Sequence, residues 1–153
     1  MTNIDRALAS IATENDTEKL MTFARNARGK SRQIEQAAIR RLAAVSARHA
    51  PGTVEHACWA MVETIEATRR LNKAKAWRMN RMRRKIEKDG ELAALEYCAL
   101  KETVGFAEVL EYGMPEFTAE AIVLRYPAAF SEAARAAARR RLDAAGVQLG
   151  APE

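Results

Sequence analysis

Glycine and proline are scarce in this chain: its 153 residues include 7 glycines and 4 prolines. The turns of a many-stranded fold recur every ~8–12 residues and are built largely from these two residue types. Their scarcity therefore excludes an all-β fold. Aromatic residues make up only 6% of the chain, whereas alanine is abundant, so we expect a core of small and aliphatic side chains.

Long apolar runs and a dense set of cysteines are also missing. No stretch approaches the ~20 consecutive apolar residues that span a bilayer, and the charged residues Asp5 and Arg6 interrupt the apolar core that a signal peptide would need. The two cysteines, Cys58 and Cys98, each lie in an apolar stretch with helical spacing, and we expect both to be reduced and buried. Together these features predict a cytoplasmic location.

Signals for the beginning and end of helices are frequent. Serine, threonine or aspartate precedes several segments whose apolar residues recur at helical spacing, and glycine or proline follows them. These signals predict helices that begin after Asn3 or Thr2, Asp16, Ser31, Thr53, Thr118 and Ser131, with others over 91–102 and 106–112. Residues 54–88 contain no clear helix breaker, and they are predicted as one long helix or as two with a bend near Asn72 and Lys73.

The predicted fold class is therefore all-α. We expect a single domain over residues 1–147, arranged as a bundle or a helical-repeat-like array of about seven to nine helices. Residues 148–153 are expected to form a frayed C-terminal tail. The domain is predicted to be a monomer or a modest homo-oligomer.

The net charge of +5 hides a very uneven distribution along the chain. Residues 69–88 hold ten basic residues and one acidic residue, whereas residues 89–120 hold eight acidic residues and one basic residue. Placed on a helix, residues 77–88 give an apolar stripe of two methionines and Ile86, with Trp77 and most cations on the remaining side. Arg83 lies nearer this stripe, where we expect it to be partly buried or to reach an acidic partner.

This cationic face favours a non-enzymatic protein that binds nucleic acid, because arginine and lysine neutralise phosphates and release counterions. An exposed Trp77 would stack on an unpaired base or pack on a sugar. The residues predicted to contact nucleic acid are Arg69, Arg70, Lys73, Lys75, Trp77, Arg78, Arg81, Arg84, Lys85 and Lys88.

Other interpretations of the basic segment stay open. It either pairs with the acidic segment 89–120 of its own chain, or it docks on an acidic surface of another protein or of a second copy. An anionic membrane is the weakest alternative, because the core needs the apolar stripe, and we expect no membrane partner. The arginines of residues 139–141, with Arg135, would extend the cationic face if the last helix packed beside residues 77–88.

Part of the chain, residues 53–142, resembles uncharacterised bacterial all-helical modules, some of which accompany nuclease-like domains. The matching pattern comprises Lys75–Ile86, Gly90, Ala94-Leu95, Gly105-Phe106, Gly113, Glu116–Glu120 and Val123–Pro127. The resemblance implies an accessory role near nucleic acid and assigns no catalytic residue. The chain departs from the pattern at Trp77, Met79 and Met82, where small hydroxyl residues would be expected among the arginines.

Residues with catalytic or metal-binding chemistry are few. His56 and Cys58 are two positions apart and point to different sides of a helix, so they do not make a zinc site, and His49 is expected at a helix end, where the dipole favours a cation. Four glutamates have spacings that would allow Mg²⁺ binding: Glu108, Glu111, Glu116 and Glu120. The alternative is that these glutamates are solvated or cap helices. We therefore predict no catalytic residue, no metal site and no cofactor.

Overall fold

A computed structural model describes residues 1–101 and 103–149 of the chain. Within these ranges it contains nine α-helices, two short 3₁₀ helices and no strand, so the all-α prediction is confirmed. The elements are α1 (Asn3–Thr13), α2 (Thr17–Ala27), α3 (Arg32–Ser46), α4 (Val54–Leu71), α5 (Asn80–Asp89), α6 (Glu91–Lys101), α7 (Val104–Glu111), η1 (Pro115–Phe117), α8 (Ala119–Arg125), η2 (Pro127–Ala129) and α9 (Glu132–Ala144).

The helix starts follow the predicted capping residues. Asp16 accepts hydrogen bonds from the amides of Glu18 and Lys19, and it thereby satisfies donors that the first turn of α2 leaves open. Thr2 makes a reciprocal pair of hydrogen bonds with Asp5. Four more helices are capped by a serine or threonine hydroxyl at the predicted position: Ser31, Thr53, Thr118 and Ser131.

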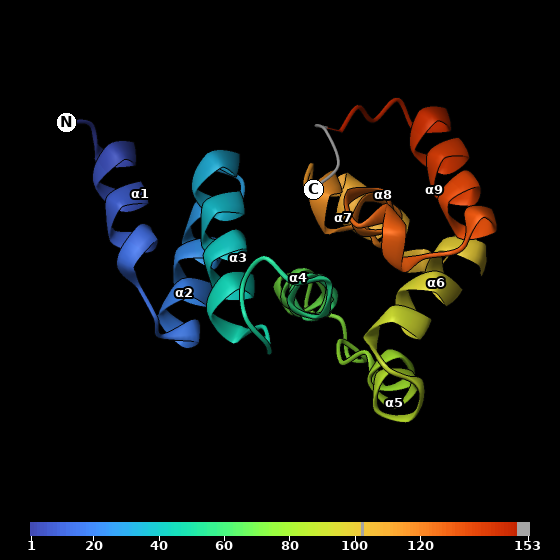
Figure 1. Cartoon of the computed structure of the whole chain (residues 1–153). Helices are drawn as coiled ribbons and strands as arrows, with labels where there is room; N and C mark the ends of the chain where they lie inside the picture. The colour runs from blue at the N-terminus through green and yellow to red at the C-terminus, as the bar shows by residue number, and fades with distance from the viewer. Residues whose placement is uncertain (102, 150–153) are drawn as a thin grey trace.

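Helix α4 occupies the middle of the molecule, and Figure 1 shows it end-on between two groups of helices. On one side α3 packs against α4, with α1 and α2 packed on α3; on the other side α6, α7 and α8 contact α4, and α9 packs on α6 and α8. Nearly every residue from Ala57 to Leu71 is buried, including the polar Thr64, Glu66 and Thr68, because α4 has helices packed against it on both sides. The buried side chains of both groups form one cluster around α4.

The basic segment 69–88 does not form one cationic helix, which corrects that prediction, but the chain does break close to the alternative bend predicted near Asn72 and Lys73. Helix α4 ends at Leu71, Lys73 has a left-handed backbone (φ 58°), and α5 begins at Asn80. Contacts from distant parts of the chain fix this break, since the Arg28 guanidinium binds the Leu71 carbonyl and the Asn72 side chain. At the other end Glu66 accepts the Met79 amide, 2.8 Å away. Trp77 therefore lies in a linker, not on a helix.

A single residue, Gly90, separates α5 from α6. Its φ of 93° and ψ of 166° lie in a region open mainly to glycine, and this turn sets the direction of α6. Helix α6 then buries Ala94, Leu95, Cys98 and Ala99 and leaves its other side in solvent. Leu92, at the beginning of α6, is exposed.

Both cysteines are free and buried, as predicted. No helix in the described ranges combines the length and apolar character needed to cross a bilayer. Residue 102, where the helix from Glu91 was predicted to end, lies outside the described residues, as does most of the predicted tail at 148–153.

Candidate nucleic-acid interface

Six of the ten cations in residues 69–88 are exposed and form no ion pair within the described part of the chain. They are Lys73, Lys75, Arg78, Arg81, Arg84 and Lys88, and we call them the cationic surface. Lys73, Lys75 and Arg78 lie in the linker before α5. Arg81, Arg84 and Lys88 are three, four and seven positions apart, so they share one side of α5.

Three other predicted contact residues have acidic partners. Arg69 on α4 makes two hydrogen bonds to Glu108 on α7, of 2.8 and 2.6 Å, and these bonds raise the pKa of the arginine. Arg70 lies 3.4 Å from Glu18, and Lys85 lies 3.0 Å from Asp89. Of the ten residues predicted to contact nucleic acid, only Arg69 and Lys85 therefore pair with carboxylates of segment 89–120 in the described ranges.

Arg83 faces α4, as the helical pattern predicted. Its guanidinium makes hydrogen bonds of 2.8 and 2.7 Å to the buried carboxylate of Glu66 and lies 3.6 Å from Glu63. The bonds to Glu66 raise the pKa of Arg83, while burial and the neighbouring Glu66 raise the pKa of Glu63. This pairing docks α5 on α4 and removes Arg83 from the solvent-facing cations.

Trp77 is less exposed than the sequence led us to expect of an aromatic stacking partner. It is half-buried in the linker, where Arg70 lies 5.4 Å from the ring centre. It also borders a small hollow that includes Leu42 of α3 and Ala67 of α4. The arrangement is that of a side chain that anchors the linker.

A groove of about 580 Å³ lies beside the cationic surface, between the first turn of α5, the outer side of α6 and the beginning of α7. Its lining includes the cations Arg69, Arg78, Arg81 and Lys85 and the apolar side chains Met79, Met82, Tyr97 and Val104. None of the described residues that line it is acidic. Cations and apolar side chains are therefore combined in one concave surface.

Tyr97 is the exposed aromatic residue of this groove, and the sequence analysis missed it. The residue keeps 47% of its accessible surface, because the inner side of α6 is formed by its small and aliphatic residues. The Lys85 ammonium lies 4.9 Å from the ring centre, a cation–π contact. Tyr97 could have been found from the sequence, because it lies on the side of the predicted helix opposite Leu95 and Ala99 and therefore faces solvent, and because the helix follows a basic segment.

Two helix N-termini add positive partial charge to the groove. Helix α5 begins at Asn80 and α7 at Val104, and both residues line it. No side chain caps either first turn within the described residues, although the Asn80 amide donates to the Arg78 carbonyl oxygen and the Phe106 amide to the Thr103 carbonyl oxygen.

The cations of the last helix do not extend the cationic surface. Arg139 and Arg140 are exposed, while Arg141 forms an ion pair with the buried Glu120 of α8. Helix α9 packs on α6 and α8, and Figure 1 shows it and α5 at opposite ends of α6. Arg135 donates to the carbonyl oxygens of Pro127 and Phe130.

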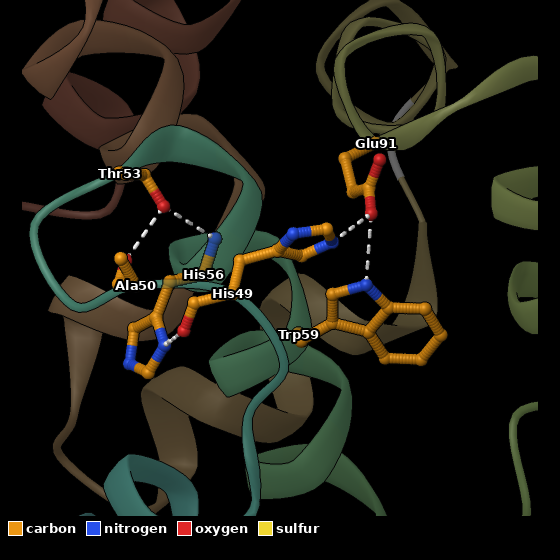
Figure 2. A network of polar contacts seen from close by, with 6 residues as sticks. All are labelled: His49, Ala50, Thr53, His56, Trp59 and Glu91. Carbon is orange, nitrogen blue, oxygen red and sulfur yellow. Dashed lines mark hydrogen bonds and ion pairs between the residues drawn. The ribbon is translucent and has the colours of Figure 1, made fainter.

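The two histidines belong to a structural network beside α4 (Figure 2). His49 Nε2 and Trp59 Nε1 lie 2.9 and 3.0 Å from the same Glu91 oxygen, and His56 Nδ1 lies 3.2 Å from the His49 carbonyl oxygen. Burial raises the pKa of Glu91, but the bonds from Trp59, from its own amide and from His49 outweigh burial and lower it. His49 lies beyond the end of α3 with φ 71°, which corrects its expected place at a helix end.

Arginines engage three of the four glutamates considered for Mg²⁺. Glu108 binds Arg69, Glu116 binds Arg40 at 2.8 Å, and Glu120 binds Arg141. Residues 1–101 and 103–149 contain no group of three or more His, Cys, Asp or Glu arranged to hold a metal ion.

Comparisons with known protein families, curated proteins and solved structures found no match for this chain. The resemblance to helical modules that accompany nuclease-like domains stays a prediction.

Proposed function

We propose that the protein binds nucleic acid as a non-enzymatic accessory protein and that the cationic surface makes the contact. The observation that supports this function best is the exposure of six cations without ion pairs in the described part of the chain, all within residues 73–88. Six like charges within residues 73–88 repel one another, whereas phosphates that neutralise them release counterions. The cationic surface therefore fits a polyanion.

The geometry of the linker and α5 supports phosphate contact. Arg81, Arg84 and Lys88 line one side of α5 over about 10 Å of helix, and Arg78 lies just before the helix. Arginine presents two parallel donors to phosphate oxygens. The pairing of Arg83 with Glu66 holds α5 so that these side chains face away from α4.

Binding to a fluorescently labelled oligonucleotide of about 20 nucleotides at ~50 mM salt, where phosphate contacts are strong, tests this function. The triple variant R78A/R81A/R84A is expected to lose at least about tenfold in affinity. The matched control R25A/R139A/R140A removes the same charge from exposed arginines on α2 and α9 that form no ion pair with any described residue, and it is expected to bind like wild type. No binding by wild type, or an equal loss in both variants, would contradict the proposal.

A second candidate function is docking on an acidic protein surface. This function is favoured by three exposed apolar residues, Tyr97, Leu100 and Val104, of which Tyr97 and Val104 line the groove. Binding to phosphates alone would not require exposed apolar side chains, whereas a protein surface would cover them. One such surface is the acidic segment 89–120 of a second copy.

Light scattering at ~50 and ~500 mM salt tests whether two copies pair in this way, because salt screens charge pairing. A dimer that dissociates at high salt supports this pairing. A monomer mass at both salt concentrations contradicts it.

A further inference from the structure

We infer that the groove beside α5 holds an unpaired nucleotide of a single-stranded nucleic acid, with its base against Tyr97 and its phosphates on Arg78 and Arg81. This inference rests on the proposed function and specifies the form of the nucleic acid. It makes the groove, rather than Trp77, the place where a base is recognised.

The groove has the size and composition of a nucleotide site. Its volume of about 580 Å³ falls within the range of about 300–1,000 Å³ common for small-molecule sites. Such sites combine apolar walls with a few polar groups that fix orientation. Here Met82, Tyr97 and Val104 supply apolar surface, and Arg78 and Arg81 supply charge at the same groove.

The base is assigned to Tyr97 because it is an exposed aromatic residue that lines the groove. Lys85 lies 4.9 Å from the ring centre, and the residue still keeps nearly half of its accessible surface. Aromatic rings presented in this way stack on bases of any identity. Val104, which is 73% exposed at the beginning of α7, adds an apolar surface that a base would cover.

The phosphates are assigned to Arg78 and Arg81 because these are the groove cations without an acidic partner in the described residues. Arg69 and Lys85 also line the groove, but Glu108 and Asp89 already neutralise them. From Arg81 the exposed cations continue along α5 through Arg84 to Lys88. A strand whose base enters the groove can therefore run along this side of α5 with its next phosphates on cations.

The nucleotide must be unpaired for this contact to form. In a duplex the faces of the bases are covered by their neighbours, so a ring within a groove cannot stack on them. Duplex phosphates would still contact Arg84 and Lys88 on the outer side of α5. A loss of stacking at Tyr97 therefore reduces binding of single strands and leaves the binding of duplex unchanged.

The test compares labelled probes of about 12 nucleotides: oligothymidylate, oligouridylate and a mixed-sequence DNA duplex. The substitution Y97L removes the ring and keeps an apolar side chain, and Y97F keeps the ring. Y97L is expected to weaken binding of both single strands by about five- to 100-fold and to change duplex binding less than twofold; Y97F is expected to bind like wild type. Comparison of the two single strands shows whether DNA or RNA is preferred.

A second measurement locates the base directly. An oligothymidylate carrying one 5-iodouracil is cross-linked by light to wild-type protein, and the modified residue is mapped by mass spectrometry. We expect the cross-link at Tyr97, and a cross-link at Trp77 would overturn the inference.

The possible failures are distinguishable. If wild type binds duplex and single strands equally and Y97L changes neither, the inference fails and the proposed function holds. If no nucleic acid binds, both fail. If a polyglutamate peptide of the same charge binds as tightly as oligothymidylate and also depends on Tyr97, the groove recognises acidic protein segments and the inference is overturned.

Discussion

Arg83 on α5 and Glu66 on α4 are joined by two hydrogen bonds of 2.8 and 2.7 Å, and Glu66 is 4% exposed. The same carboxylate accepts the amide of Met79. Glu66 therefore holds both the end of the linker and the first turns of α5. The orientation of Arg78, Arg81 and Arg84 depends on this carboxylate, although it lies outside the basic segment.

Replacing Glu66 with glutamine should destabilise the protein by about 3 kcal/mol, because it leaves the partly buried Arg83 without its main counter-charge. The double variant E66Q/R83M removes the orphaned charge and keeps an acceptor for the Met79 amide, so it should recover most of that loss. Urea unfolding of the three proteins measures both effects. If E66Q unfolds at the same urea concentration as wild type, the Arg83–Glu66 pair does not stabilise the packing of α5 on α4.

Gly90→Ala should lower the free energy of unfolding by about 1–3 kcal/mol, since a side chain is strained at φ 93°. Nothing lies within 4 Å of the position that an added Cβ would take, so the loss reports backbone strain and not a clash. Thermal unfolding measures it. An unchanged melting temperature would mean that α5 and α6 can rearrange around this turn.

The Glu91 carboxyl should make stability depend on acid pH. Its pKa in the folded chain lies below its ordinary value of 4.5, so the stability contributed by its charge is fully present above about pH 4.5. That contribution is lost as the pH falls through the folded pKa. The difference in unfolding free energy between wild type and E91Q should therefore have its full value above about pH 4.5 and shrink as the pH falls below it. The control E87Q alters an exposed carboxylate on α5 that forms no ion pair in the described residues, and it should be about as stable as wild type at pH 7.

Neither thiol should react in the folded protein. Burial raises the pKa of Cys98 to about 12 and raises that of Cys58 as well, which leaves little thiolate at pH 8. A thiol reagent such as dithionitrobenzoate should label both cysteines in denaturant and neither within minutes in buffer. Rapid labelling of the native protein would show that α4 or α6 opens locally.

The sequence predicted those parts of the fold that local chemistry decides. Asp16, Ser31 and Thr118 mark helix starts because each side chain binds amides two or three residues away. Arg83 was placed correctly because its helical angle puts it near the apolar stripe of α5. These features depend on residues within one or two helical turns.

A break near Asn72 and Lys73 was one of two arrangements that the sequence allowed, but the sequence could not decide between them or predict the linker over residues 72–79. The break depends on Arg28, which is 43 residues from Leu71 in the chain, and on Glu66. Trp77 was consequently placed on a helix face that does not exist. Tyr97 was overlooked because the groove that it lines forms only when α5, α6 and α7 pack together.

The salt dependence of oligonucleotide binding tests the central claim most directly. For single strands the logarithm of the binding constant falls with the logarithm of salt concentration by about 0.7 per phosphate contact. Removing Arg78, Arg81 and Arg84 should therefore flatten this slope by about two units, while R25A/R139A/R140A should keep the wild-type slope. Equal slopes in wild type and R78A/R81A/R84A would contradict the assignment of phosphate binding to the cationic surface.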